Sequence, residues 1–352
     1  MELLEGSAAI AESAIAAGCR FFAGYPMSPF TGLLENMSHK LPAAGAVFIN
    51  AESEIEGVNM AIGAAATGAR AATGSCGQGI ALMQEAIAEA ALNEMLMVVF
   101  NMARNQQDYF QCTRGGGWGD YRTITLAPKD VPEAVEHTQR LFHLADKYRA
   151  PVILYGDPLI AQTRVGVTIS RMDFGELRPK DWALDGTGGG TGRSRQIWTW
   201  AMGKATDPGP GPDRHWRAVA TKFQSIEDAE QLHEQSDVDD AETVVVAFGS
   251  AAKFVEYVVR ELRAEGHKVG WFRPVTLWPF PGAALTEATR KAKRVLVFEL
   301  NAGQMLDDVR MHAADRSKIT FIGGVSIAES GLAYGELLDA PVLRNLILEA
   351  SR

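Results

Sequence analysis

The chain has 352 residues, of which 47% are hydrophobic and 22% charged, and its formal net charge is −9. This length predicts about two domains at the usual 100–200 residues each, with enough apolar content for real cores. The negative charge argues against a nucleic-acid surface, which needs clustered Lys and Arg to displace counterions. Cys19, Cys76 and Cys112 are too few and too scattered for a zinc or iron–sulfur site, so we expect no metal site on this chain.

The N-terminus and the apolar segments indicate a cytoplasmic protein with no membrane span. Glu2, Glu5 and Glu12 stand where a secretory signal would carry basic residues. Three glutamates interrupt the longest apolar stretch, residues 80–103, which therefore does not read as a transmembrane helix. The low cysteine count also suits a reducing compartment.

Residues 5–29 predict a helix, a strand and a second helix start. Apolar residues recur at helical spacing over 5–18, and the apolar run 19–26 predicts a strand that ends in a Gly-Pro turn. Ser28 is expected as the N-cap and Pro29 as the first residue of the next helix. The loop before that helix would lie at the carboxyl end of a strand, where open α/β sheets bind ligands. A simple helix cap is the commoner role for such a serine.

Residues 45–104 repeat the unit of strand and helix. The strand at 45–53 leads into a helix that opens with Glu52, Glu54 and Glu56. The helix dipole stabilises such carboxylates by about 0.3–1 kcal/mol each, which alone would explain the cluster. The glycine-rich turn 74–79 presents backbone amides at a helix N-terminus, although its spacing matches neither the P-loop nor the dinucleotide fingerprint.

The next segments complete a first α/β domain. Residues 95–104 predict a buried parallel strand, and its end places Arg104 in the ligand crevice or in solvent. The glycine-rich residues 105–128 predict a loop that folds over a site. An amphipathic helix over 129–149 and a strand over 150–158 follow. This alternation predicts a doubly wound parallel sheet for the first 165 residues.

The second half begins with a break in the pattern. Residues 166–240 are Gly- and Pro-rich, and we expect an excursion and linker whose tryptophans, Trp198, Trp200 and Trp216, cover a surface. The acidic run 227–242 is expected in solvent. A smaller α/β domain then follows over residues 241–352, with strands expected at 243–248 and in three later apolar segments.

Several motifs, in this order, resemble the α subunit of the 2-oxoacid:ferredoxin oxidoreductases, in particular those acting on 2-oxoglutarate or branched-chain 2-oxoacids. The motifs are GYPMSP (24–29), AESE (51–54), TGSCGQG with LMQE (73–85), FNMAR (100–104), GGGWGDYR (115–122) and FELNAGQM (298–305). The resemblance implies a thiamine diphosphate pyrimidine-binding domain in residues 1–165 and a transketolase C-terminal-like domain in residues 241–352.

The resemblance also implies roles for single residues. Glu54 matches the family's glutamate that hydrogen-bonds the pyrimidine ring of the cofactor, and Arg104 matches the arginine that holds the substrate carboxylate. Ser28 stands at the position of a family residue that contacts the substrate. The residues expected to line the cofactor site, besides Glu54, are Tyr25, Pro26, Gln78 and Gly79. A carboxyl group that hydrogen-bonds to the pyrimidine favours the imino tautomer of the cofactor, and the imino group then acts as the base. A guanidinium can form two charge-assisted hydrogen bonds with a substrate carboxylate.

The implied reaction is oxidative decarboxylation of a 2-oxoacid to acyl-CoA and CO₂, with electrons passed to ferredoxin. A separate β subunit would bind the diphosphate and Mg²⁺, and iron–sulfur clusters would lie on that subunit or on further γ and δ subunits. The chain lacks the Gly-Asp-Gly pattern of diphosphate binding, since Asp120 and Asp157 stand in other contexts.

Two other functions fit the same residues. One is a half-site subunit of a non-oxidative thiamine diphosphate decarboxylase or acyl transferase, which would share Glu54 but pass no electrons. The other is a catalytically silent α/β interaction module, in which Glu54 only compensates the helix dipole and Arg104 is solvated.

Overall fold

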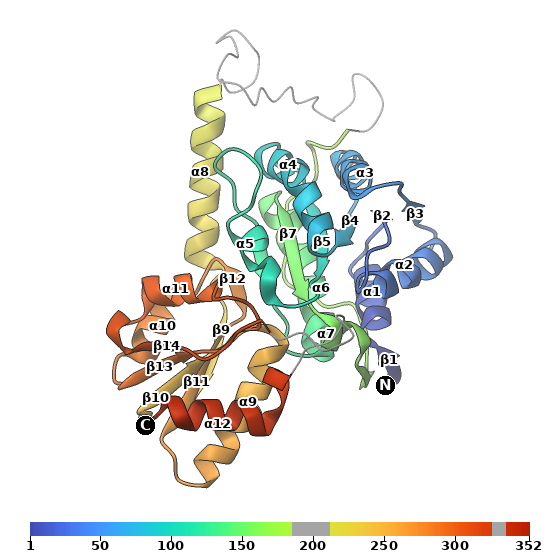
Figure 1. The fold of residues 1–352 in the computed structure, drawn as a ribbon. Coiled ribbons are helices and arrows are strands. Elements are labelled where there is room, and N and C mark those ends of the chain that lie inside the picture. The colour runs from blue at the N-terminus through green and yellow to red at the C-terminus, as the bar shows by residue number, and fades with distance from the viewer. Residues whose placement is uncertain (185–211, 326–335) are drawn as a thin grey trace.

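The computed structural model describes residues 1–184, 212–325 and 336–352 (Figure 1). Two sheets organise these residues: one of seven strands, built from the blue-to-green half of the chain and one later, orange strand, and one of five strands in the yellow-to-red part. A two-stranded antiparallel ribbon of β1 (Glu2–Glu5) and β8 (Arg164–Val167) ties the N-terminus to the end of the first half. None of the described helices is both long enough and apolar enough to cross a membrane.

The seven-stranded sheet has the order β12-β6-β7-β5-β4-β2-β3 and is parallel except for β12, which runs antiparallel to β6. β5 and β7 are buried at every position, as expected for central strands covered on both faces. The strands are β2 (Phe21–Gly24), β3 (Val47–Asn50), β4 (Ala71–Ser75), β5 (Met97–Met102), β6 (Ile124–Leu126), β7 (Pro151–Gly156) and β12 (Thr276–Trp278).

The helices of this half pack in two groups, α1 with α2 and α6, and α3 with α4. Capping side chains fix two of their starts: Ser53 accepts a hydrogen bond from the Glu56 N–H in α3, and Asp130 accepts one from the Glu133 N–H in α6. The helices are α1 (Gly6–Ala16), α2 (Thr31–Ala43), α3 (Glu54–Ala66), α4 (Gln78–Leu92), α5 (Tyr109–Thr113), α6 (Val131–Tyr148) and α7 (Pro158–Gln162).

The five-stranded sheet has the order β14-β13-β10-β11-β9 and is parallel except for the edge strand β9. Helix α9 packs on β11, α12 packs on α9, and α10 packs on α11. The elements are β9 (His233–Ser236), β10 (Thr243–Val246), α9 (Gly249–Ala264), β11 (Val269–Pro274), α10 (Gly282–Thr289), β13 (Arg294–Val297), α11 (Met305–His312), β14 (Ile319–Phe321) and α12 (Ala340–Ala350). The predicted doubly wound sheet followed by a second α/β unit is confirmed.

Residues 212–236 of the predicted excursion and linker form a helix and a strand. Helix α8 (Pro212–Ala229) buries Phe223 and Ile226, and β9 pairs with β11, so part of the acidic run belongs to a sheet. Trp216 packs edge-on against Trp118 with ring centroids 6.3 Å apart, whereas Trp198 and Trp200 lie outside the described residues. The domain limits 1–165, 166–240 and 241–352 stay a prediction.

Ser28 does not cap a helix, contrary to expectation. Helix α2 begins at Thr31, and the Ser28–Pro29 peptide bond is cis. The carbonyl of Ser28 accepts hydrogen bonds from Cys76 Sγ (3.2 Å) and from Arg104 Nε (3.1 Å). These contacts hold Ser28 in the loop after β2, because its carbonyl is engaged by neighbouring strand ends rather than by the first helical turn.

An ion pair of the buried Arg273 and a hydrogen bond join the two halves. Arg273 on β11 is 1% exposed, and its guanidinium donates to both carboxylate oxygens of Glu133 on α6, at 2.8 and 2.9 Å. Its Nη2 also lies 2.9 Å from a carboxylate oxygen of Glu234 on β9. The hydroxyl of Ser250 donates to Asp157 at the start of α7. Together with β12, which pairs with β6 at the edge of the first sheet, these contacts fix the second unit against the first.

Candidate active site

Most of the candidate residues meet at the carboxyl ends of β2, β4 and β5. Arg104, which follows β5, donates from Nε to the Ser28 carbonyl (3.1 Å) and from Nη1 to Gln78 Oε1 (2.8 Å). Its Nη2 lies 3.2 Å from Met27 Sδ. The loop after β2, the start of α4 and the end of β5 therefore converge on one guanidinium, which is held by neutral acceptors.

Glu54 is a buried acid at this edge. It is the first residue of α3 and is 4% exposed, and its Oε1 accepts a hydrogen bond from the Ser75 hydroxyl at 3.1 Å. Gly79 faces the same oxygen: a Cβ at that position would lie 2.4 Å from Glu54 Oε1 and 2.0 Å from Ser75 Oγ. A glycine is thus required beside this carboxylate, since any side chain would overlap it.

Tyr25 and Pro26 lie in the loop directly after β2, on the same edge, and both are exposed. Within the described part of the chain no hydrogen bond joins either side chain to Glu54 or Arg104. Ser28 contributes its main-chain carbonyl. The structure therefore brings Ser28, Gln78 and Arg104 into direct contact, places Glu54 beside Gly79, and leaves Tyr25 and Pro26 at the rim.

Two further groups at this edge were missed from the sequence. Asp108 is 5% exposed, and its Oδ2 accepts a hydrogen bond from the Gly77 N–H at 2.9 Å. Burial raises the pKa of this carboxyl, while the hydrogen bonds from Gly77 and Asn101 and the charge of Arg104 act in the opposite direction. Asp108 lies in the polar run after Arg104, and no local pattern there predicts its contact with the glycine-rich turn.

The second missed group is the thiol of Cys76, at the end of β4. Burial raises the pKa of Cys76 to about 11, with Arg104 opposing the rise and Asp108 and Glu54 adding to it. A buried, un-ionised thiol of this kind is chemically inert and packs as a small apolar residue beneath the strand ends. Within the described residues no group of three His, Cys, Asp or Glu side chains is arranged to hold a metal ion.

The glycine-rich loop 114–123 packs on the side of α4. The hydroxyl of Tyr121 donates to Gln84 Oε1 (3.0 Å) and accepts hydrogen bonds from the amides of Gly116 and Gly117, each at 3.1 Å. A Cβ at Gly117 would lie 2.5 Å from the Gln84 carbonyl, so the loop needs glycine to approach this closely. Its contacts are with the middle of α4, well along the helix from Gln78.

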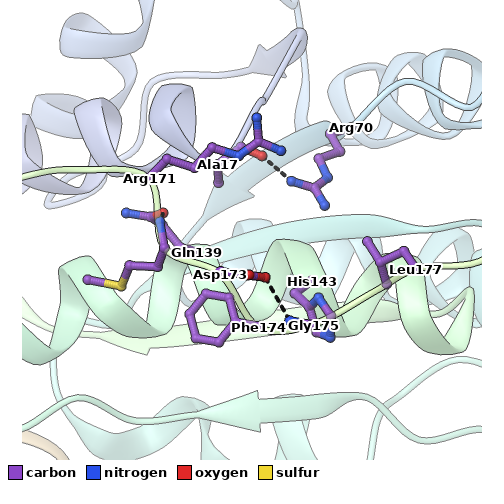
Figure 2. Close-up of a pocket in the computed structure, with 10 residues that line it drawn as sticks. Ala17, Arg70, Gln139, His143, Arg171, Asp173, Phe174, Gly175 and Leu177 are labelled. Carbon is purple, nitrogen blue, oxygen red and sulfur yellow. Dashed lines mark hydrogen bonds between the residues drawn. The ribbon is translucent and has the colours of Figure 1, made fainter.

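A cavity of about 450 Å³ lies elsewhere in this half of the molecule (Figure 2). Arg70, Arg171 and Ala17 line one side of it, and Gln139, His143 and Phe174 line the other. Arg70 precedes β4, whereas the candidate residues follow the strands, so the cavity belongs to the opposite edge of the sheet. Arg70 is moreover paired with Asp146 at 2.8 Å. This cavity and the candidate residues therefore lie at different edges, and we assign the site by its chemistry.

Two family models match most of the chain. A family model described as the thiamine diphosphate-binding part of pyruvate flavodoxin/ferredoxin oxidoreductase matches residues 12–182, and one for core domain II of pyruvate:ferredoxin oxidoreductase matches residues 241–329. The ketoisovalerate oxidoreductase subunit VorB of Methanothermobacter thermautotrophicus is 34% identical over 90% of this chain and 90% of its own length. The chain belongs to the 2-oxoacid:ferredoxin oxidoreductase family. The 2-oxoglutarate synthase subunit KorA of Methanocaldococcus jannaschii is likewise 34% identical, over 88% of this chain and 91% of its own.

Solved structures extend the likeness to the whole chain. The 2-oxoglutarate:ferredoxin oxidoreductase of Magnetococcus marinus, determined with 2-oxoglutarate, coenzyme A and succinyl-CoA bound, superposes with a TM-score of 0.83 at 25% identity. The likeness covers 100% of this chain but 65% of that one, so the chain spans about two thirds of this member of the family. A split-gene transketolase shares the fold alone, with a TM-score of 0.57 at 12% identity.

The family predicted from the sequence motifs is confirmed, as is the presence of a thiamine diphosphate-binding domain. The curated relatives are named as subunits of 2-oxoacid oxidoreductases, which places this chain among enzymes that act on oxo groups. The roles of Glu54, Arg104 and the other individual residues stay predictions.

Proposed function

We propose that this chain supplies the pyrimidine side of a thiamine diphosphate active site in a 2-oxoacid:ferredoxin oxidoreductase. The complex would convert a 2-oxoacid and coenzyme A to acyl-CoA and CO₂ and pass the electrons to ferredoxin. The observation that supports this most directly is the buried Glu54 carboxylate, 4% exposed, at the same strand edge as Arg104. A buried acid and a guanidinium held by neutral acceptors at one strand edge suit acid–base chemistry on a carboxylate substrate.

The residues at this edge fit the cofactor. Gly79 packs directly against the Glu54 carboxylate, since a Cβ at that position would overlap Glu54 Oε1. The Ser75 hydroxyl occupies Glu54 Oε1 and so orients the carboxyl group, which can then hold a proton at a ring nitrogen of the pyrimidine. When bound, thiamine diphosphate supplies a carbon nucleophile for the keto group and a sink for the electrons left by CO₂. Gln78, Tyr25 and Pro26 would line the surrounding wall.

Arg104 would hold the substrate carboxylate. Its nitrogens donate to the Ser28 carbonyl, the Gln78 side chain and the Met27 sulfur, all of them neutral groups. Among the described residues no carboxylate lies within ion-pair distance of it. The guanidinium is therefore oriented without a direct ion pair, and a 2-oxoacid could form charge-assisted hydrogen bonds with it. Ser28 stands beside it and would contact the substrate.

The proposal requires partner subunits. The chain lacks the diphosphate pattern, and the curated relatives are named as subunits, which supports a β subunit that binds the diphosphate and Mg²⁺. Iron–sulfur clusters would lie on that subunit or on γ and δ subunits, and ferredoxin would dock on the assembled complex. Coenzyme A and a 2-oxoacid are the proposed small-molecule partners, since the Magnetococcus marinus enzyme has coenzyme A and 2-oxoglutarate bound. The three unpaired cysteines suit the cytoplasm.

The test is to purify the native complex and supply a panel of 2-oxoacids with thiamine diphosphate and Mg²⁺. We expect ferredoxin reduction that depends on both the 2-oxoacid and coenzyme A, with one acyl-CoA formed per CO₂ released. Release of CO₂ without reduction of any acceptor would instead assign the chain to a non-oxidative decarboxylase. Absence of turnover with every 2-oxoacid in a complex that binds the cofactor would overturn the proposal.

A further inference from the structure

A side chain of the first half is inserted between two strands of the second. The parallel strands β10 and β13 pair up to Val246 and Val297, and the Phe298 N–H donates to the Val246 carbonyl at 2.9 Å. The next rung of such a ladder would join the Leu300 N–H to the Phe248 carbonyl. Gln106 takes both places: its Oε1 accepts from the Leu300 N–H at 2.7 Å, and its Nε2 donates to the Phe248 carbonyl at 2.9 Å.

This amide is buried and fully used. Gln106 is 1% exposed, and its main-chain carbonyl also accepts a hydrogen bond from Asn301 Nδ2 at 2.8 Å. A primary amide carries a donor and an acceptor in one plane, which is what an interrupted parallel ladder needs to satisfy both strand ends. Leaving either strand end unpaired in this buried place would be costly.

The insertion occurs where the second sheet would be expected to bind a ligand. From β10 the chain goes to β11 on one side and later to β13 on the other, so the strand order reverses between β10 and β13. Open α/β sheets bind their ligands in the crevice outside the carboxyl ends of strands at such a point. Here the first half of the same chain occupies the crevice, and Tyr109 adds a hydrogen bond from its hydroxyl to Asp308 at 2.7 Å.

The inserted turn also contacts the candidate site of the first sheet. Gln106 stands two residues after Arg104 and two before Asp108, and Asp108 accepts the hydrogen bond of the Gly77 N–H. Gln304 of the second half holds the same turn from outside: its Nε2 donates to the Gln107 carbonyl at 2.8 Å. One turn of chain is therefore fixed to the second sheet on one side and to the candidate site on the other.

We propose that Gln106 is a positioning residue, through which the crevice between β10 and β13 sets the place of Arg104 at the substrate edge. The inference rests on the proposed role of Arg104 in binding the 2-oxoacid. The second unit then has a function of its own. By binding residues 105–110 it fixes the geometry of a site to which it contributes no reacting group.

The decisive variant is Gln106→Met, studied in the assembled complex. Methionine keeps the length and approximate volume of the side chain and removes both hydrogen bonds to the strands. We expect kcat/KM for the 2-oxoacid to fall roughly 10- to 100-fold, mainly through KM, because small misplacements of a positioning group have effects of this size. Amide hydrogen exchange at Leu300 should become faster, while the affinity for thiamine diphosphate should not change.

Gln107→Met is the matched control, because Gln107 is the exposed neighbour whose contact with Gln304 uses only its main-chain carbonyl. We expect its KM and its exchange at Leu300 to equal those of the wild type. A second variant, Gln304→Met, loosens the turn from the other half and should raise KM in the same direction by a smaller factor. If Gln106→Met does not assemble, Gln304→Met decides, and an unchanged KM in that variant overturns the inference.

Arg104→Leu, measured in parallel, separates this inference from the proposed function. If Arg104→Leu raises KM while the Gln106 and Gln304 variants leave it unchanged, the amide is only a structural contact and the positioning role is overturned, although the proposed function stands. If Arg104→Leu leaves KM unchanged, the assigned role of Arg104 fails, and the positioning role fails with it. Increases in KM for Arg104→Leu, Gln106→Met and Gln304→Met, with Gln107→Met unchanged, support both.

Discussion

The carboxyl edges of the two parallel sheets are built alike and used in opposite ways. At the edge of the seven-stranded sheet, Tyr25 and Gln78 are exposed, and Arg104 is half-buried and held by neutral groups. At the edge of the five-stranded sheet, Leu300 and Phe248 are fully buried beneath the inserted Gln106. One edge is open to solvent, and the other is closed by the chain itself.

This difference limits the rule that open α/β sheets bind ligands where their strands end. The rule locates main-chain groups that still need partners, and it does not say whether a ligand or a neighbouring segment will supply them. In this chain the segment that closes the second edge follows directly on the arginine of the first. The closed edge can therefore serve the open one, and the predictions below test each side of this contrast.

The largest effect is expected from removing the buried acid of the open edge. Glu54→Ala should lower turnover by about 10²- to 10⁴-fold, the usual contribution of a positioned acid or base, while the complex still assembles. Exchange of the proton on the reactive carbon of thiamine diphosphate, followed by NMR in the assembled complex, measures this directly. Exchange at the wild-type rate in Glu54→Ala would show that the carboxylate only compensates the helix dipole.

Glu56→Ala is the control for that experiment. Glu56 lies in the same helical turn but is exposed; its Oε2 accepts a hydrogen bond from the Glu52 N–H at 2.9 Å, and its own N–H donates to the hydroxyl of the N-cap Ser53. Its loss should lower the stability of the protein by about 1 kcal/mol and leave the proton exchange unaffected. Equal losses of exchange in the two variants would contradict the special role of Glu54.

The next largest effect is expected at Arg104. Arg104→Leu should raise KM for the 2-oxoacid roughly 10- to 100-fold, because a hydrogen bond to a charged group contributes about 1.5–3 kcal/mol. Steady-state kinetics over a range of 2-oxoacid concentrations give the value. Arg171→Leu removes an exposed arginine from the cavity at the opposite edge and should leave KM unchanged. An unchanged KM in Arg104→Leu would mean that another group holds the carboxylate.

Local patterns predicted the open edge well, because each of its parts follows from neighbours in sequence. Glu54 stands at a capped helix start, Gly79 in a glycine-rich turn, and Arg104 at the end of an apolar strand, and all three lie at the carboxyl edge of the first sheet. The error at Ser28 had a non-local cause. Its carbonyl is taken by Arg104, 76 residues later, which outweighs the local preference of a Ser-Pro pair for a helix start.

The closed edge could not be predicted in this way. The partners of Gln106 in the second sheet lie 142 and 194 residues away, and nothing in the polar run that contains it signals an insertion between strands. The same holds for β12, a three-residue strand that leaves the second unit to pair with β6, and for β9, whose edge position depends on β11. Pairings of this kind follow from how the two units dock, which no local pattern encodes.

A smaller effect, on stability, is expected from the docking of the two units. Glu133→Gln should lower the free energy of unfolding by about 1.5–3 kcal/mol, because the nearly inaccessible Arg273 loses a charged partner and keeps only Glu234. Urea denaturation of the purified protein measures the change. Glu136→Gln, on the same helix, removes an exposed pair with Arg140 and should change the value by less than about 0.5 kcal/mol. Equal effects would show that the buried arginine does not stabilise the interface.

The smallest effect concerns the reactivity of the buried Cys76 thiol at the open edge. With a pKa of about 11, roughly one Cys76 thiol in a thousand is ionised at pH 8, against about one in ten at the ordinary value of 9.0. Native protein treated with iodoacetamide at pH 8 should therefore carry almost no label on Cys76 by mass spectrometry, and labelling should increase as the pH approaches 11.

Cys19 is the reference for that labelling. It is equally buried, its pKa is raised to about 12 by burial, and it lies at the amino end of β2, away from the open edge. The two thiols should be labelled at similarly low rates in the native protein and at equal, fast rates in urea. Fast labelling of Cys76 alone would mean that solvent reaches the buried ends of the strands at the open edge. The difference between the open and the closed edge would then include buried residues of the first sheet as well as exposed ones.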